Sequence, residues 1–209
     1  MILKKIKSAI SIIRKLGLHN FIIGYLNLFF YTLIKPIFGF EEWHRSNPFH
    51  LRPYKKYVVD LINELNPNTT IEVGCGLGEM LQRVKSKKKI GIDPSPNVIK
   101  ANRLVHTFSN TEWVVGDISA INDLDTKDID VIFMIGWLHI IKPKELQKLL
   151  ISICDKTKYL VVDRFIKDLN EKDFFHDFSY LEDSMDLISE KKTDKDDVRS
   201  YCIYKRKEI

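Results

Sequence analysis

From residue 54 onward, the hydrophobic and polar positions follow two alternating patterns. Apolar residues recur at helical spacing in four segments, which predicts helices over 54–65, 78–86, 96–106 and 142–156. Short β-branched or apolar runs predict strands over 69–74, 88–95, 111–117, 128–137 and 158–165, and two final strands at 185–190 and 198–206. The run at 128–137 is almost continuously apolar, as expected for a strand buried on both faces.

Strands that alternate with helices at short intervals indicate an α/β fold with a parallel sheet covered on both faces. Right-handed crossovers then give a doubly wound sheet, in which ligands bind outside the carboxyl ends of the strands. Polar or aromatic residues at those ends therefore gain weight as site candidates: Glu72, Asp93, Asp117, Trp137, His139 and Asp163.

The first 40 residues have a different character. Residues 1–20 are basic and apolar in helical rhythm, and residues 21–34 are almost wholly apolar. This run is shorter than the ~20 apolar residues that cross a bilayer, which disfavours a true span. Two interpretations stay open: a segment that lies on a membrane surface, or a helical cap that packs on the domain or on a second copy. We divide the chain into this segment (1–40), a linker or lid (41–57) and a domain (54–209).

Composition narrows the function only slightly. The chain has 209 residues, which suits one domain with an appendage, and a formal net charge of +5. That charge permits an anionic substrate or an acidic membrane surface, but it does not require a nucleic acid. The three cysteines are far apart and form no C-x-x-C pair, which argues against a disulfide scaffold or a cysteine zinc site and favours the cytoplasm.

The stretch "TTIEVGCGLGEML" (69–81) carries the clearest chemistry. Its glycines are spaced G-x-G-x-G, whereas a dinucleotide fold uses G-x-G-x-x-G. Glu72 lies two residues before the first glycine, where its carboxylate would repel a pyrophosphate and favour a cationic ligand such as an ammonium. This disfavours a nicotinamide-dependent dehydrogenase.

Two further carboxylates extend the pattern. Asp93 ends the next strand, 19 residues after Gly74, where a carboxylate can accept both hydroxyls of a ribose. Asp117 ends the third strand, where it can accept from the exocyclic amine of a base, although it could instead cap a helix. Together these positions describe a ligand with an amino-acid head, a ribose and an adenine.

The segments "IEVGCGLGEM", "GIDPSPNVIKAN" and "VVGDI", in this order and spacing, resemble the first motifs of class I S-adenosylmethionine-dependent methyltransferases. The resemblance covers roughly residues 54–163 and implies a seven-stranded Rossmann-like sheet with an antiparallel last strand. It also implies methyl transfer from the sulfonium of S-adenosyl-L-methionine by direct displacement. The cofactor residues that it implies are Glu72, Gly74, Cys75, Gly76, Asp93, Pro94, Asp117, Ile118, Gly136 and Trp137.

Candidates on the acceptor side are less specific. "GWLHIIKP" places His139 after the fourth strand, and each of His139 and His176 could take an acceptor proton or serve only in packing. In "DFFHDFSY", His176 and the adjacent Asp177 could form an orienter–base pair, although adjacent residues rarely point the same way. The linker "EEWHRSNPFHLRPYKKY" could fold over the site as a lid, or it could be a solvated linker. In the lid, Arg52 could pair with a phosphate or carboxylate of the substrate. The residues expected to contact substrate are Trp43, His44, Arg52, Tyr54 and Arg164.

The chain also resembles, more loosely, small methyltransferases of bacterial surface-polysaccharide biosynthesis. We therefore expect O-methylation of a small or lipid-linked sugar or phosphate-bearing acceptor in the cytoplasm, at the inner face of the membrane if residues 1–40 bind it. The alternatives are an N-methyltransferase of a small molecule and a non-catalytic, membrane-tethered scaffold. The place after the fourth strand reads "IGWLH", which disfavours nucleic-acid base methylation, and no metal cluster is evident. A homodimer stays open.

Overall fold

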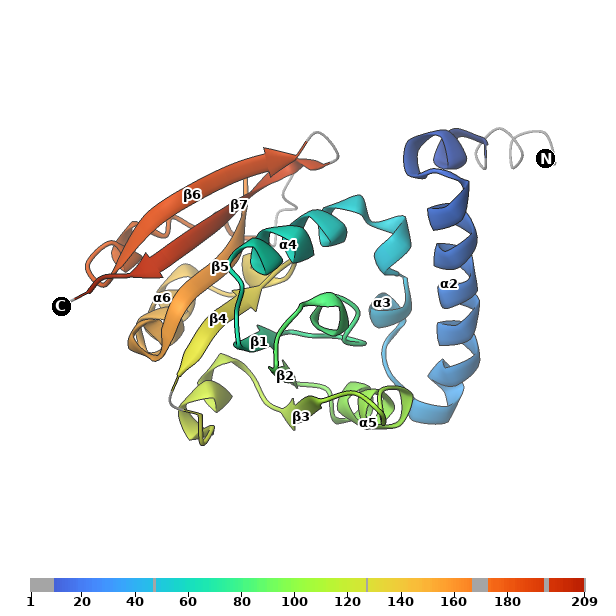
Figure 1. Ribbon diagram of the computed structural model, residues 1–209, viewed down its shortest axis with the longest axis horizontal. Coiled ribbons are helices and arrows are strands. Elements are labelled where there is room, and N and C mark those ends of the chain that lie inside the picture. Colours follow the sequence, from blue (N-terminus) through green and yellow to red (C-terminus); the bar gives the residue numbers. More distant parts are fainter. Residues whose placement is uncertain (1–9, 47, 127, 167–172, 194–195, 209) are drawn as a thin grey trace.

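A seven-stranded mixed sheet forms the centre of the protein (Figure 1). The computed structural model describes residues 10–46, 48–126, 128–166, 173–193 and 196–208. The strands are β1 (Thr69–Val73), β2 (Lys88–Asp93), β3 (Thr111–Val115), β4 (Ile129–Met134), β5 (Thr157–Phe165), β6 (Met185–Thr193) and β7 (Asp196–Arg206). Their order is β3-β2-β1-β4-β5-β7-β6; β1 to β5 pair in parallel, and β7 runs antiparallel to both β5 and β6. The predicted sheet is confirmed, including its antiparallel last strand.

Helices cover both faces of the sheet because the central strands are apolar on both sides. On β4, Val131 and Phe133 pack on one face, with helix α4 (Pro53–Glu64), while Ile132 and Met134 pack on the other, with helix α6 (Pro143–Ile151). All four side chains have 0% exposure. The continuous apolar run seen in the sequence therefore is a doubly buried strand.

Helix α5 (Pro96–Val105) begins where its sequence predicts. Pro96 occupies the first turn, and the Ser95 side chain accepts a hydrogen bond from the Val98 amide at 3.4 Å. The helix follows β2 directly, so its start lies beside the carboxylate that ends that strand. Ser95 also donates its own amide to Asp93, which ties the helix start to the strand end.

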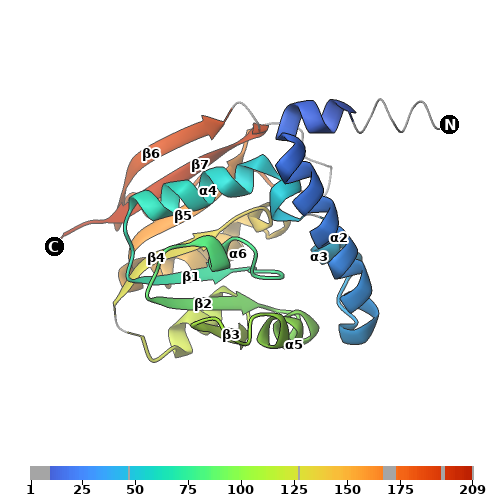
Figure 2. The ribbon, with the colours of Figure 1, turned by 45° about the vertical axis from the view of Figure 1, so that its right-hand side comes forward.

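The N-terminal segment forms a wall along one side of the domain. Residues 10–16 are helical, and helix α2 (Leu18–Phe38) continues to the short helix α3 (Glu42–Arg45). The carboxyl ends of β1 and β2 point toward α2 and α3 (Figure 2). A small cluster joins α2 to the glycine loop and to α5, made by Tyr31, Phe38, Phe40, Leu77, Val98 and Ala101.

The predicted helix over 78–86 is wrong. Only a 3-10 turn, Leu81–Arg83, forms there. The Leu81 amide donates to the Glu72 carboxylate at 3.0 Å, and the Leu77 carbonyl accepts from the ring of His106 at 3.1 Å. An α-helix would need that amide and that carbonyl to bond with each other, so these two tertiary contacts replace the helical ladder.

Candidate active site

Four carboxylates lie at the carboxyl ends of the parallel strands. Asp117 follows β3, Asp93 ends β2, Glu72 lies in β1 and Asp163 lies near the end of β5. Glu72, Asp93 and Asp163 are only 2%, 2% and 3% exposed, whereas Asp117 is exposed. Because the strand order is β3-β2-β1-β4-β5, these groups form a row along one edge of the sheet, at the switch point between β1 and β4.

The glycine turn after β1 sits at the centre of this row. The amides of Gly74 and Cys75 donate to the Ile92 carbonyl at 2.8 and 3.0 Å, which ties the turn to β2. Gly74 has φ +71°, and a Cβ there would lie 2.3 Å from Nε1 of Trp137. The indole is fixed over the turn because this same nitrogen donates to the Val73 carbonyl at 2.9 Å. Glycine is therefore required at this position for conformation and for space.

A cavity of about 130 Å³ opens above the turn. Its wall is formed by Trp43, His44, Tyr54, Lys55, Glu72, Gly74, Cys75, Gly76, Leu77, Glu79, Met80, Ile135, Gly136 and Trp137. Two carboxylates, Glu72 and Glu79, face one ammonium, Lys55, so the fixed charge of the wall favours a cation. Burial raises the pKa of Glu72 well above its usual value, and nearby Lys55 only partly opposes this. A bound ammonium or sulfonium would supply the missing positive charge.

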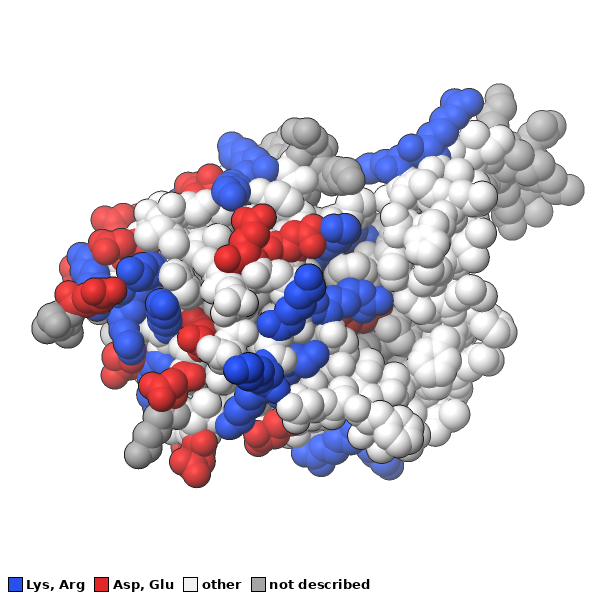
Figure 3. Space-filling model, in the orientation of Figure 1, with Lys and Arg blue, Asp and Glu red and all other residues white. Residues whose placement is uncertain are grey.

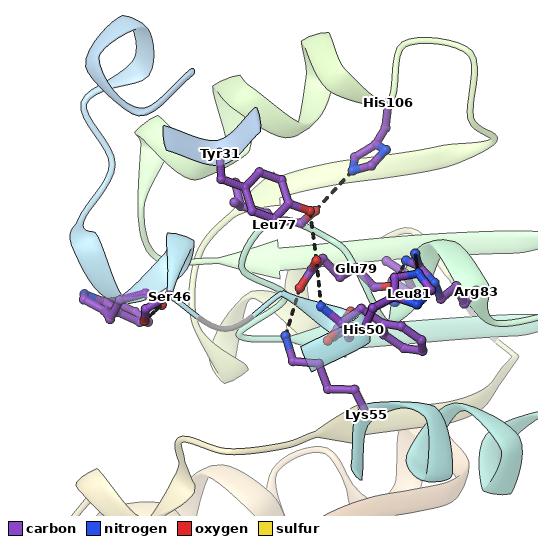
Figure 4. A network of polar contacts seen from close by, with 12 residues as sticks. Tyr31, Ser46, His50, Lys55, Leu77, Glu79, Leu81, Arg83 and His106 are labelled. Atoms are coloured by element: carbon purple, nitrogen blue, oxygen red, sulfur yellow. Dashed lines mark hydrogen bonds and ion pairs between the residues drawn. The ribbon is translucent and has the colours of Figure 1, made fainter. Parts of the chain in front are cut away.

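Glu79 connects the cavity to the N-terminal segment (Figure 4). Its Oε1 accepts from the Tyr31 hydroxyl of α2 and from the Phe49 amide, both at 2.9 Å, and its Oε2 pairs with Lys55 of α4 at 2.9 Å. The carboxylate is 8% exposed, so these partners replace water almost completely. Three segments far apart in the sequence are thereby held against one wall of the cavity.

Asp93 has the geometry for a ribose, but a histidine stands beside it. Its Oδ2 accepts from the Gly76 amide at 2.9 Å and its Oδ1 from the Ser95 amide at 3.0 Å. Each carboxylate oxygen has a second lone pair, so two hydroxyls can still be accepted. The His44 ring lies over the turn, since its Nδ1 would be 3.6 Å from a Cβ on Gly76, and it interacts electrostatically with Asp93. Because the ring occupies space over the turn, we expect it to move when a ribose binds at Asp93.

His44 belongs to a roof formed by α3. Its ring stacks on Trp43 at 3.7 Å between centroids, and Trp43 is 60% exposed. Burial lowers the pKa of His44, against the opposing effects of Asp93 and Glu41, so the ring is held neutral near pH 7. The cavity is smaller than the ~300 Å³ or more of typical ligand pockets. Opening this roof would provide the space that a nucleoside requires.

The remaining predicted cofactor residues divide into two groups. Ile118 is fully buried below the edge, and Cys75 is a buried filler beside Gly91. Pro94 and Asp117 are exposed on the β2 and β3 side. Asp117 Oδ1 accepts from the amide and the hydroxyl of Ser119, so it caps the 3-10 turn Ile118–Asp123, as the alternative interpretation expects. Its second oxygen is available to a base amine.

On the β5 side, Asp163 joins the loop after β4 to strand β7. Both of its oxygens accept from the Gly136 amide at 3.0 Å, and Oδ2 pairs with Arg199 of β7 at 3.0 Å. The guanidinium lies between the rings of Tyr54 and Phe165, with its Cζ 4.6 and 4.7 Å from their centroids. Cation–π contacts and the ion pair together fix this arginine at the junction of β5, β7 and α4.

The predicted acid–base candidates are in different situations. His139 packs its ring on Phe165 at 4.6 Å, and its Nε2 lies 3.9 Å from Asp173. His176, by contrast, bonds through Nε2 to the Leu138 carbonyl at 2.9 Å, while Asp177 accepts from the amide and hydroxyl of Ser179. Within the described residues no hydrogen bond joins His176 to Asp177, so the expected orienter–base pair does not form.

Arg164 does not reach the cavity. Its guanidinium pairs with Glu190 of β6, and successive residues of a strand point to opposite faces, which turns it away from Asp163. Its predicted substrate role is therefore wrong. Among the described residues, no group of three His, Cys, Asp or Glu side chains is placed to hold a metal ion.

Several functional residues had no signal in the sequence. Lys55, Glu79, Arg199 and Asp173 contribute charge to the site, but they come from a helix, a loop, the last strand and an irregular segment. Glu79, Lys55 and Asp173 lie inside segments that the sequence analysis quotes, but nothing there distinguishes them from their neighbours. The role of Glu79 depends on Tyr31 and Lys55, which are 48 and 24 residues away. Pairing across such separations requires the fold.

Comparisons with known proteins agree with this geometry. Residues 71–158 match the model of a methyltransferase domain family. Among solved structures, the N-methyltransferase NodS from Bradyrhizobium japonicum WM9 with S-adenosyl-L-homocysteine superposes with TM-score 0.64 at 13% identity, covering 87% of this chain and 100% of that one. The PH0226 protein from Pyrococcus horikoshii OT3 gives 0.61 at 16%, covering 80% and 100%.

Magnesium protoporphyrin IX methyltransferase from Synechocystis PCC 6803, with bound S-adenosylmethionine, gives a TM-score of 0.59 at 12% identity, covering 90% of this chain and 97% of that one. The search of curated proteins found no match. At these identities the structures show the fold, while the family match falls on the glycine turn and the strand ends described above. The sheet therefore has the fold of class I S-adenosylmethionine-dependent methyltransferases, and residues 71–158 match a methyltransferase domain family.

Proposed function

We propose that the protein transfers the methyl group of S-adenosylmethionine to an oxygen of a small anionic acceptor, of the sugar or sugar-phosphate type found in surface-glycan precursors. The observation that carries this proposal is a groove of about 420 Å³ beside the cofactor cavity. It is lined by Ile12, Lys15, Leu16, Tyr25, Ser46, Leu51, Arg52, Pro53, Tyr54, Val198 and Arg199. Tyr54 lines both the groove and the cavity, which makes it the junction between them.

The charge of this groove favours an anion. Its three charged lining residues, Lys15, Arg52 and Arg199, are all cations. Arg199 is ion-paired with Asp163, whereas the side chains of Arg52 and Lys15 are exposed and make no hydrogen bond or ion pair with any residue that the structure describes. A guanidinium presents a planar pair of donors that matches a carboxylate or phosphate. Arg52, next to the junction residue Tyr54, is therefore the proposed anchor of the acceptor.

The chain's other residues supply alignment and proton transfer. S-adenosylmethionine, when bound, supplies a methyl group on a positively charged sulfur. Glu72 and the glycine turn hold its amino-acid portion, and Trp137 and Gly136 border the transfer site. His139 accepts the proton of the acceptor hydroxyl, with Asp173 as its nearest carboxylate at 3.9 Å. The displacement requires mainly that the acceptor oxygen, the methyl group and the sulfur are aligned. The roof of Trp43 and His44 would exclude water from these atoms.

Methyl transfer to paired acceptors tests the proposal. The protein is incubated with labelled S-adenosylmethionine and with hexoses, hexose phosphates, uronic acids and their amino-sugar counterparts, and mass spectrometry locates the new methyl group. We expect O-methylation of the charged members. Methylation of nitrogen alone would favour the N-methyltransferase alternative, and cofactor binding without turnover on any acceptor would favour the scaffold.

Arg52→Gln sharpens the test. Loss of a charge-assisted hydrogen bond should raise KM for the anionic acceptor by about 10- to 100-fold and leave cofactor affinity unchanged. Lys56→Gln is the matched control, since Lys56 lies in the first half of helix α4, which begins directly after Arg52, is exposed, and pairs with Asp60 outside the groove. Equal KM values for the two variants would contradict the role of Arg52.

A further inference from the structure

Helix α2 exposes a continuous apolar face on the side away from the domain. Its buried residues are Gly24, Tyr31 and Phe38. On the outer face, large apolar side chains recur every three or four residues: Leu18 (59% exposed), Ile22 (48%), Leu26 (60%), Phe29 (63%), Leu33 (53%) and Ile37 (72%). A helix that faces water should be polar on its outer side, so this pattern indicates a surface that another apolar phase covers.

The charge distribution indicates what that phase is. Residues 1–40 contain six Lys or Arg and no Asp or Glu. The whole chain has 33 Lys and Arg, which leaves 27 for residues 41–209 against all 28 Asp and Glu. The entire positive excess of the protein therefore lies on the segment that carries the apolar face. In Figure 3 the side formed by α2 is white, with basic atoms near its upper end and no acidic atoms along it.

An apolar stripe with basic residues and no acidic ones fits an anionic bilayer surface. A second copy fits less well, because a parallel pairing of two such segments would bring their cations together. The helix is 21 residues long and apolar enough to cross a membrane by length and composition. Crossing, however, would break the Tyr31–Glu79 hydrogen bond, the contact of Gly24 with Leu51, and the bond from Arg45 to Thr32 at 2.8 Å.

We propose that the outer face of α2 docks the protein on an anionic membrane, with the helix axis in the plane of the bilayer and the domain on the aqueous side. The inner face keeps its contacts with the glycine loop while the outer face enters the interface. Docking by this face does not depend on which acceptor the protein methylates. It also has a consequence for the acceptor groove, because Ile12, Lys15, Leu16 and Tyr25 of the same segment line it. The groove would open close to the headgroups, where a lipid-linked acceptor lies.

Vesicle flotation of the full chain tests the proposal. We expect the protein to float with vesicles of phosphatidylcholine and phosphatidylglycerol, and at least about 10-fold less with phosphatidylcholine alone. The triple variant Leu26→Ser, Phe29→Ser, Leu33→Ser should lose at least about 10-fold of this binding, because it removes apolar contact area from the stripe. Arg14→Gln should reduce binding by about 5-fold.

A double variant on α5 and the loop after it is the matched control. Leu104 and Phe108 are also large, apolar and exposed (66% and 103%), but they lie outside α2, so Leu104→Ser with Phe108→Ser should float like the wild type. Thermal melting and cofactor titration confirm that every variant is folded.

Three results would overturn the proposal. One is equal flotation of the triple variant and the control, and another is no flotation with any vesicle. The third is a dimer that is seen in sedimentation, is abolished by the triple variant and does not bind vesicles. A second copy would then cover the apolar face. Alkaline extraction decides the orientation: release from vesicles supports the in-plane helix, and retention indicates a span and contradicts it.

Discussion

The cofactor edge and the acceptor groove are built in opposite ways. At the edge, Glu72 and Asp93 are almost fully buried and held by backbone amides within one β-loop-β unit. In the groove, Lys15, Arg52 and Arg199 come from the N-terminal segment, the residue before α4 and strand β7, and two of the three are exposed. In the proposed function, the cofactor is thus bound by local geometry, whereas the acceptor is selected by side chains that the tertiary fold brings together.

The largest effect should come from the carboxylate of β2. Asp93→Asn removes the charge that accepts the ribose hydroxyls while keeping the side-chain volume. We expect about 100-fold weaker binding of S-adenosylmethionine by calorimetry, because hydrogen bonds to a charged group are the strong ones. Asp117→Asn is the control: its carboxylate is exposed, and the loss should stay below about 5-fold. A larger effect at Asp117 would mean that burial does not determine how much each carboxylate of the edge contributes to cofactor binding.

The glycine turn gives the next effect. Gly74→Ala introduces a Cβ at φ +71° that would lie 2.3 Å from Trp137, so the indole must leave the turn. We expect a stability loss of about 2–4 kcal/mol in denaturant titration and loss of cofactor binding. Gly17→Ala shares a positive φ of +81° but meets nothing within 4 Å, so it isolates the backbone strain of about 1–2 kcal/mol. Equal losses would show that Trp137 has no part in the effect.

The hydrogen bond that joins helix α2 to the wall of the cofactor cavity can be tested separately. Tyr31→Phe removes the hydroxyl that joins α2 to Glu79, and leaves one acceptor of a buried carboxylate unpaired. The free energy of unfolding should fall by about 1–3 kcal/mol. Tyr159→Phe is the comparison, because the Tyr159 hydroxyl has no hydrogen bond in the part of the chain that the structure describes. An unchanged stability for Tyr31→Phe would mean that α2 is held only by its apolar cluster.

The smallest effect concerns pH. Burial lowers the pKa of His176 below its usual 6.5, and the bond to the Leu138 carbonyl only partly opposes this. The folded state thus keeps the ring neutral, while the unfolded state takes up a proton below pH 6.5, so stability is lost as the pH falls through that value. His176→Asn removes this contribution. Its melting temperature should fall less than that of the wild type between about pH 7.5 and 5.5; an identical fall would contradict the assignment.

Sequence patterns predicted the sheet, because it depends on local periodicity, and they placed the glycine turn, Glu72 and Asp93 at strand ends where the structure has them. Their role toward the cofactor stays a prediction. The helix expected at 78–86 does not form because the Leu81 amide donates to Glu72, 9 residues away, and the Leu77 carbonyl accepts from His106, 29 residues away. The pairing of His176 with Asp177 failed for a related reason, since each side chain finds a nearer backbone partner. Arg199 and Lys55 could not be found, because nothing in a strand or a helix marks which cation will face a site.

A crystal structure of the protein with S-adenosyl-L-homocysteine tests the central claim most directly. We predict that the ribose hydroxyls lie within hydrogen-bond distance of Asp93, that the homocysteine ammonium lies beside Glu72 over the glycine turn, and that His44 has moved off Asp93. Density for the nucleoside at any other place, with His44 still covering Asp93 and the turn left empty, would contradict the account.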